Sequence, residues 1–129
     1  MPREPIPDEL RRFILTSVPS VPFVEAMLLF MAKEDAALSV DEIARGLYLP
    51  RGAALQVIEA LREAHIVAAD PAQPEANRFA PASPELDAML RNLATFYARD
   101  LIGVTDLIHS RTARRAQQFA DAFRIRKDS

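Results

Sequence analysis

The sequence contains no cysteine, and it has only three glycines and two histidines among its 129 residues. The absence of cysteine excludes a disulfide scaffold, a thiolate zinc site and cysteine catalysis. So few glycines leave no glycine-rich phosphate loop, and His65 and His109 lack the spacing of metal ligands. Asp106, His109 and Ser110 lie on one predicted helix, where neighbours seldom reach the geometry of a catalytic triad. We therefore expect no cofactor, no metal and no enzymatic activity.

Signals for export or membrane insertion are also missing. The first eight residues are polar and include three prolines, which does not fit a signal peptide. The longest apolar run, residues 26–32, is far too short to span a bilayer. Half of the residues are hydrophobic, so the chain can bury a core of common domain size. We expect a soluble, cytoplasmic protein with a flexible arm over residues 1–8.

Positive charge is scarce over most of the chain. The net charge is −2, with +4 on residues 111–129 and −6 on residues 1–110. A strongly basic chain would point to nucleic acid by itself, whereas here DNA binding would have to depend on the fold and on local basic patches. The basic C-terminal segment is either a source of additional nucleic-acid contacts or a solvated helix that packs its phenylalanines onto the body. Its candidate contacts are Arg114, Arg115, Arg124, Arg126 and Lys127.

Two helices are predicted in the N-terminal part. Asp8 can cap a short helix over residues 9–17, and apolar residues recur on one face of that segment. Two prolines then interrupt the helical pattern. Pro22 suits the first turn of a second helix over residues 22–32, which is apolar on more than one side and is therefore expected to be buried.

A capping box gives the clearest local signal in the chain. The hydroxyl of Ser39 can accept from the amide of Glu42, while the Glu42 carboxylate can accept from the amide of Ser39. The helix that starts here is expected to end at Gly46, because glycine tolerates the left-handed backbone of a C-cap. A short turn then leads to another helix over residues 50–64.

The second half of the chain predicts a small hairpin followed by a long helix. Residues 66–69 and 77–80 have the pattern of two short strands joined by a proline-containing loop. A serine cap and a proline open a helix that is expected to continue over residues 84–110. The fold class is therefore mainly α with a small β-hairpin, followed by a basic helix from residue 111.

Apolar residues recur along the long predicted helix at helical spacing. A helix of this length would measure about 39 Å, whereas a compact domain of this size is about 28 Å across. We therefore expect part of the stripe to form a homodimer seam, the alternative being that it packs on the N-terminal helices of its own chain. The predicted seam residues are Leu86, Leu90, Leu93, Tyr97, Leu101, Val104 and Ile108.

Residues 38–67 resemble the winged helix-turn-helix of bacterial transcription regulators. The resemblance lies in the capped S-V-D-E-I-A opening, the L-Y-L-P turn, the A-L-Q-V-I-E-A-L helix and the H-I-V strand entry. The wing followed by a long helix is similar to dimeric regulators of the multiple-antibiotic-resistance or PadR kind. The resemblance implies a winged-helix domain over residues 9–82, a dimerisation helix over 83–110 and a homodimer on an inverted-repeat DNA site.

In such a domain the second helix of the motif enters the major groove. The resemblance then implies base readers early on that helix and phosphate contacts from the flanking elements. Transferred to this chain, the expected DNA-binding residues are Arg45, Arg51, Gly52, Ala53, Gln56, Arg62 and Arg78. A ligand-sensing variant would carry a pocket between the N-terminal helices and the long helix, although the sequence indicates no ligand.

Two features depart from typical regulators of this kind. The wing tip has acidic residues and no basic one, and residues 39–82 hold four arginines against six acids. Phosphate neutralisation supplies much of the affinity for DNA, so a protein-interaction module with the same fold is the alternative. His65 stands where glycine is usual at the end of the helix, and we interpret it as a left-handed cap.

Overall fold

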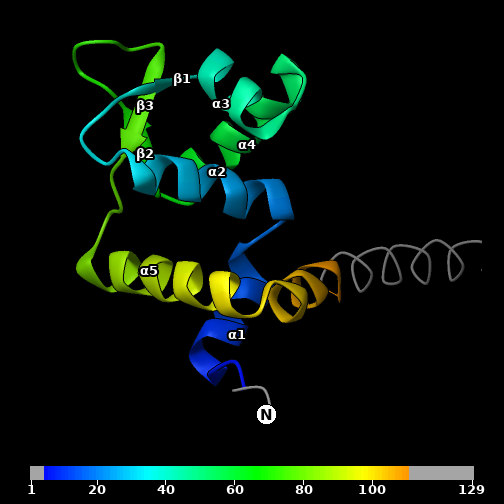
Figure 1. The fold of residues 1–129 in the computed structure, drawn as a ribbon. Coiled ribbons are helices and arrows are strands. Elements are labelled where there is room, and N and C mark those ends of the chain that lie inside the picture. The colour runs from blue at the N-terminus through cyan, green and yellow to red at the C-terminus, as the bar shows by residue number, and fades with distance from the viewer. Residues whose placement is uncertain (1–4, 111–129) are drawn as a thin grey trace, which may run out of the picture.

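The computed structural model describes residues 5–110, so the first four residues and the basic segment from residue 111 lie outside the described part. The candidate contacts from Arg114 to Lys127 therefore have no structural account. The described chain is mainly helical, with a small antiparallel sheet (Figure 1). In order, its elements are α1 (Asp8–Ser17), α2 (Val21–Ala32), β1 (Leu38–Ser39), α3 (Val40–Leu47), α4 (Arg51–Glu63), β2 (Val67–Ala69), β3 (Ala76–Phe79), α5 (Pro84–Arg99) and a final helix over Leu101–Ser110.

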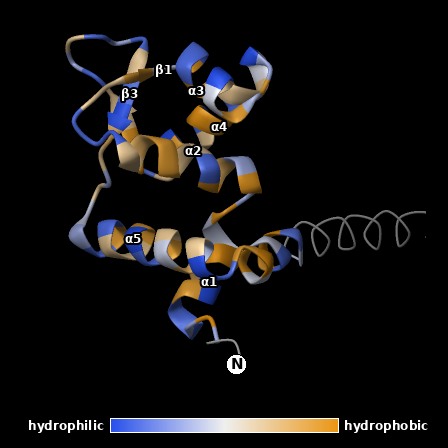
Figure 2. Cartoon of the chain, viewed as in Figure 1, coloured by the Kyte–Doolittle hydropathy of each residue, from blue (hydrophilic) through white to orange (hydrophobic). Residues whose placement is uncertain are grey.

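Helix α2 forms the middle layer of the molecule. Helices α3 and α4 and the sheet lie on one side of it, and α5 with the 101–110 helix lies on the other (Figure 1). Most of α2 is apolar (Figure 2), and five of its side chains are buried, in agreement with the prediction. Its first turn is capped by Ser20, whose hydroxyl accepts from the Phe23 amide at 3.3 Å. At α1 the prediction was slightly wrong, because the helix includes Asp8 and has Pro7 at its N-cap.

The capping box at the start of α3 is confirmed. The Glu42 amide donates to the Ser39 hydroxyl at 3.1 Å, and the Ser39 amide donates to the Glu42 carboxylate at 3.2 Å. The expected end at Gly46 is wrong, because α3 continues to Leu47 and the left-handed residue is Tyr48, with φ of 56°. Gly46 instead faces α2, because a Cβ added there would lie 2.9 Å from Leu29 Cδ1, at the end of that side chain.

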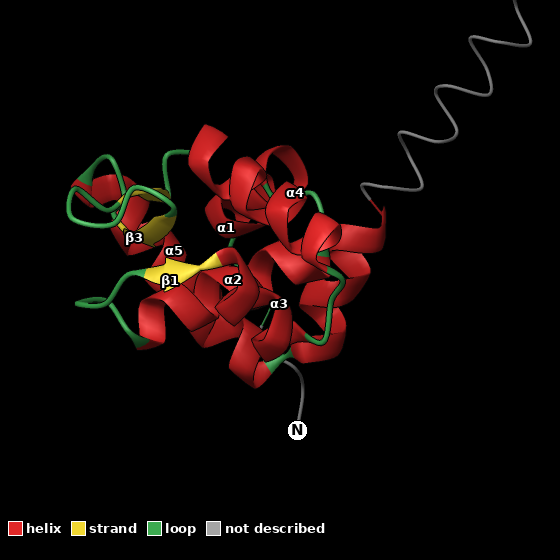
Figure 3. Ribbon diagram, turned by 90° about the horizontal axis from the view of Figure 1, so that it is seen from above, coloured by secondary structure: helices red, strands yellow, loops and turns green. Residues whose placement is uncertain are grey.

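Helix α4 ends close to the predicted position, and the chain then turns at His65. This residue has φ of 61°, which confirms the left-handed conformation expected there. The hairpin is also confirmed within one residue at each strand, since β2 pairs with β3 in antiparallel register. No sequence pattern predicted β1, a two-residue strand that adds to the other edge of β3 and gives the order β1-β3-β2. Figure 3 shows the strands on one side of the helices.

The single long helix predicted over residues 84–110 is wrong. Helix α5 starts at the predicted Ser83 cap, but it ends at Arg99, and Asp100 leaves the helical conformation with φ of −140°. The Asp100 carboxylate accepts from the Gly103 amide at 3.0 Å. Aspartate therefore caps the start of a new helix, and the length argument for a second subunit no longer applies.

Four of the seven predicted seam residues are fully buried within the single chain. Leu90, Leu93, Val104 and Ile108 have no exposed surface, and α5 packs on α1. Their side chains are therefore already covered by their own chain, as the alternative interpretation required. Among the other three, Leu86 and Tyr97 are half-buried, and Leu101 is 53% exposed.

Within the described residues, no single helix is long and apolar enough to cross a membrane. Helices α1 and α2 meet the criterion of length and composition only as a pair, and that pair is bent by 109°.

Candidate nucleic-acid interface

The candidate interface is built on α3, α4 and the sheet. Helices α3 and α4 pack against each other, and only Tyr48, Leu49 and Pro50 separate them. The left-handed Tyr48 ends α3, and its amide donates to the Arg45 carbonyl at 3.4 Å. Proline at the N-cap of α4 has extended backbone. These local conformations lead the chain from α3 into α4 within three residues.

The predicted DNA-binding residues lie on these elements and are accessible to different extents. Five of them are exposed: Arg45 on α3, and Arg51, Gly52, Gln56 and Arg62 on α4. Two are half-buried, namely Ala53 on α4 and Arg78 on β3. A Cβ added at Gly52 would meet nothing within 4 Å. The side of α4 that carries Gly52 is therefore open to an approaching ligand.

Arg51 does not project freely from the start of α4. Its Nε donates to Asp41 Oδ1 at 3.1 Å, which links the first turn of α4 to the first turn of α3. Both side chains remain about two-thirds exposed, and such surface pairs stabilise a protein by about 0–1 kcal/mol. The pair therefore orients Arg51 but holds it only weakly. A phosphate or base that bound Arg51 would have to displace Asp41.

Arg78 is also close to an acidic residue, at the end of the hairpin. Its Nη1 lies 3.7 Å from Asp70 Oδ1, and the other oxygen of Asp70 accepts from the Gln73 amide at 3.0 Å. The Asp70 side chain is only 13% exposed, whereas that of Arg78 is 41% exposed. Asp70 therefore holds the loop of the hairpin in shape and at the same time reduces the positive charge that Arg78 presents.

The charge of the interface is consequently weak. Two of its four arginines contact carboxylates, and within residues 5–110 no ion pair involves Arg45 or Arg62. Glu59 and Glu63 lie on the same helix as Arg62 and are exposed. Within the described part of the chain, this surface therefore has two arginines outside any ion pair, and the other two would have to leave a carboxylate before they could bind a phosphate.

Two exposed apolar side chains on these elements were not among the predicted site residues. Tyr48 is 96% exposed at the turn between the helices, and Leu55 on α4 is 38% exposed. The L-Y-L-P turn marked the position of Tyr48, but a periodicity argument reveals neither its left-handed backbone nor its exposure. An exposed phenol beside two helices can donate a hydrogen bond or offer an apolar face to a partner.

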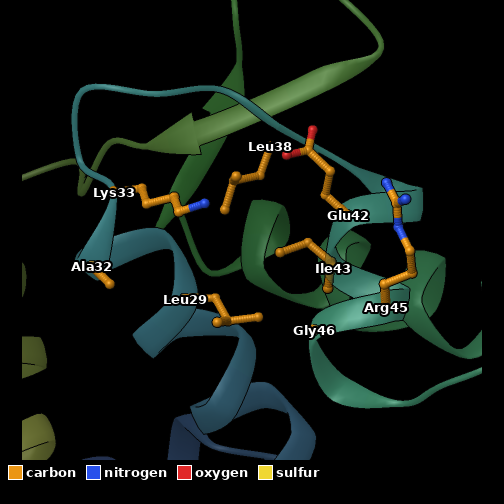
Figure 4. A pocket seen from close by; sticks show the side chains of 8 residues that line it. All are labelled: Leu29, Ala32, Lys33, Leu38, Glu42, Ile43, Arg45 and Gly46. Atoms are coloured by element: carbon orange, nitrogen blue, oxygen red, sulfur yellow. The ribbon is translucent and has the colours of Figure 1, made fainter.

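A pocket of about 290 Å³ lies between α2 and α3, away from the position expected for a ligand. Figure 4 shows its lining residues, which come from the last turns of α2, from β1 and from α3. Another hollow of about 500 Å³ lies between the start of α1 and the 101–110 helix, where the prediction placed a ligand pocket, and its lining includes Asp8, Asp100 and Asp106. Within residues 5–110, no group of three or more His, Asp or Glu side chains is placed to hold a metal ion.

Comparison with known proteins gives no family assignment. No protein-family model matches the chain, and neither a curated protein nor a solved structure matches it.

Proposed function

We propose that α2 to β3 form a winged helix-turn-helix and that the protein is a transcription regulator that binds duplex DNA. The observation that carries the proposal is the order α2-β1-α3-α4-β2-β3 with the sheet order β1-β3-β2. This arrangement sets a two-helix unit with a three-residue turn beside a two-stranded hairpin. In proteins with such a unit, the second helix reads the major groove.

Helix α4 is the element proposed to enter the groove. Its N-terminal turns carry Arg51, Gly52 and Gln56, all of them exposed. An arginine guanidinium can donate two hydrogen bonds to guanine, and a glutamine amide can both donate to and accept from adenine. Gly52 and Ala53 are small, so they allow the backbone to approach the base edges closely. Arg45 from α3 and Arg62 from the far end of α4 are proposed to contact phosphates.

The hairpin supplies the proposed wing. Arg78 on β3 is proposed to contact a phosphate after it leaves Asp70, from which it is separated by 3.7 Å. The exposed loop over residues 71–75 has one acidic residue and no basic one. The wing is therefore expected to contribute less affinity than α4, and the basic segment from residue 111 is proposed to supply further positive charge.

A homodimer on an inverted repeat remains part of the proposal. Its contact is now expected around the exposed Leu101 and Ile102, which are 53% and 62% exposed at the start of the 101–110 helix. The proposed contact is limited to these two side chains because most of the seam residues predicted from the sequence are buried within the chain. The expected location of the protein is the cytoplasm of a bacterium.

The experiment is a gel shift with genomic fragments at low and moderate salt. We expect at least one fragment to be retained better than random DNA, and we expect its affinity to fall with salt because counterions are released. Arg45→Gln, Arg51→Gln and Arg62→Gln should each weaken retention, whereas Arg12→Gln on α1 is the matched control for loss of one charge. If no fragment is retained better than random DNA at low salt, the proposal fails.

A protein-interaction module is the second candidate function. The exposed Tyr48 and Leu55 favour it, together with the acidic residues around α4. The apolar side chains would contact the partner, and the carboxylates would select one with a basic surface. A protein partner captured by the full chain and lost on Tyr48→Ala, with DNA retention unchanged, would support this second function.

A further inference from the structure

The geometry points to a binding site for a small aliphatic carboxylic acid in the pocket between α2 and α3. The site comprises an apolar floor, two cations at its rim and a volume of about 290 Å³. It is separate from the exposed face of α4, and it does not depend on the function proposed above.

The floor of the pocket is aliphatic. Leu38 from β1 and Ile43 from α3 have 5% and 0% of their surface exposed, and Leu29 approaches them from α2 (Figure 4). No aromatic side chain is part of the lining. A hydrocarbon body that covers these side chains gains about 25 cal/mol for each Å² removed from water.

Gly46 keeps the pocket open on the α3 side. A Cβ added there would lie 2.9 Å from Leu29 Cδ1, so a larger residue would force the end of the Leu29 side chain to shift at the pocket wall. The hollow beside this contact is thus a consequence of how α2 and α3 meet. It belongs to the folded framework rather than to a loop.

The rim carries positive charge that is free to bind a ligand. The Lys33 ammonium extends over the pocket, and Arg45 stands at its opposite side (Figure 4). Within residues 5–110, neither cation forms an ion pair. The acid at the rim, Glu42, already accepts from the Ser39 amide at 3.2 Å. A carboxylate ligand would therefore meet Lys33 as its charge partner while its chain lies on the floor.

The size of the pocket restricts the ligand. Pockets for drug-sized molecules span roughly 300–1,000 Å³, and this one lies at the lower edge of that range. A short or branched monocarboxylate fits the volume and the single accessible ammonium. A nucleotide would leave charged groups against Leu29 and Ile43, where burial without a partner is unfavourable.

The test is an NMR titration of the DNA-free full chain with hexanoate, hexanamide and hexylamine. We expect hexanoate to shift the amide signals of Leu29, Ile43 and Gly46 saturably and to bind at least fivefold more tightly than hexanamide. Hexylamine should bind more weakly than either, because it brings a second cation to Lys33. Equal binding of all three probes, or no saturable shift with hexanoate, would overturn the proposal.

Two variants test separately the contribution of the Lys33 charge and that of the pocket volume to binding. Lys33→Gln should reduce hexanoate affinity at least fivefold and leave hexanamide affinity unchanged, while Arg12→Gln should change neither. Ala32→Met, which places a long side chain at the pocket wall, should weaken both probes while the circular dichroism spectrum stays the same. If Lys33→Gln and Arg12→Gln have equal effects on hexanoate, Lys33 is not the charge partner and the site is wrong. Because no DNA is present, neither result depends on DNA binding.

Discussion

Arg91 of α5 donates a hydrogen bond from Nη2 to Glu34 at 2.7 Å, although the two residues are 57 positions apart. The same guanidinium donates from Nε to Asp87 one turn earlier on α5, and it lies 5.9 Å from the centre of the Phe79 ring. Arg91 thus contacts its own helix, the segment after α2 and the end of β3. It links the C-terminal helix layer to the proposed DNA-binding unit.

Arg91→Met should lower the melting temperature, because it keeps most of the alkyl stem but loses the links to both carboxylates. These links hold the pKa of Arg91 above its ordinary value, first through the hydrogen bond with Asp87 and then through that with Glu34. The loss should be small, since the site is exposed and water screens the charges. Thermal unfolding followed by circular dichroism measures it.

Glu34→Gln provides the companion variant. It should lower the melting temperature less than Arg91→Met, because Asp87 remains, and both effects should shrink in 1 M salt as charges are screened. Equal melting temperatures for Arg91→Met and the unchanged protein at low salt would contradict a linking role for this residue.

Tyr97 should make the protein less stable in alkaline solution. Burial raises the pKa of Tyr97 above its ordinary value of 10.0, and the charge of Glu25 raises it further. The folded state then holds its proton at a pH where the unfolded state has lost it, so the free energy of unfolding falls as the pH rises from about 10 through the folded-state pKa. Below pH 10 this contribution is fully present.

Urea unfolding between pH 8 and pH 11 measures the dependence on Tyr97. In Tyr97→Phe the decrease above pH 10 should be smaller than in the unchanged protein. Tyr48→Phe is the matched control, because Tyr48 is 96% exposed, and it should leave the alkaline decrease in place. Identical pH profiles for Tyr97→Phe and the unchanged chain would rule out this role.

Asp41→Asn should strengthen DNA binding if the proposed function holds. Asp41 accepts from Arg51 Nε at 3.1 Å, so its charge competes with a phosphate or base for the same guanidinium. Removing one negative charge near a bound phosphate is expected to raise affinity several-fold at low salt. Fluorescence anisotropy with a labelled duplex measures the change.

Two further variants serve as controls for Asp41→Asn. Glu9→Gln on α1 also removes one exposed carboxylate and should leave affinity nearly unchanged. Asp41→Asn combined with Arg51→Gln should lose the gain, because the gain acts through Arg51. A gain that persists in the double variant would show that Asp41 acts only through the general charge of the surface.

Asp100→Ala should destabilise the C-terminal part of the fold. It removes the acceptor for the Gly103 amide at 3.0 Å, and loss of an N-cap costs about 1 kcal/mol. Asp100→Asn should restore most of the stability, because its side-chain oxygen can accept from the same amide. Urea unfolding of both variants checks the difference, and equal destabilisation by Ala and Asn would show that the cap is not the cause.

Local signals predicted those parts of the fold that depend on local chemistry. Ser39 with Glu42, Ser83 and His65 each act through backbone groups a few residues away, and their roles are confirmed. The prediction for Gly46 was wrong because the C-cap is Tyr48, and the contact that Gly46 makes is with Leu29 on another helix. Strand β1 has only two residues, which is too short to show a period.

The break between the two C-terminal helices at Asp100 could not be predicted from the apolar pattern. Leu90, Leu93, Val104 and Ile108 keep a helical spacing across the break, so the apolar pattern alone suggests one continuous helix. The hydrophobic positions are right, but their partner is their own chain. At the candidate interface the exposed arginines were predicted, whereas the carboxylate of Asp41 that holds Arg51 could be assigned only with both helices in place.

The pairing of β1 with β3 joins Leu38 to Asn77 and closes a loop that contains all of α3 and α4. Because α3 also packs against α4 and β1, we expect loss of the β1–β3 pairing to weaken the packing of both helices. In hydrogen-exchange terms, we expect α3, α4 and β3 to open as one cooperative unit. Strand β1, which has only two residues and was not predicted, is therefore expected to couple the opening of this part of the molecule.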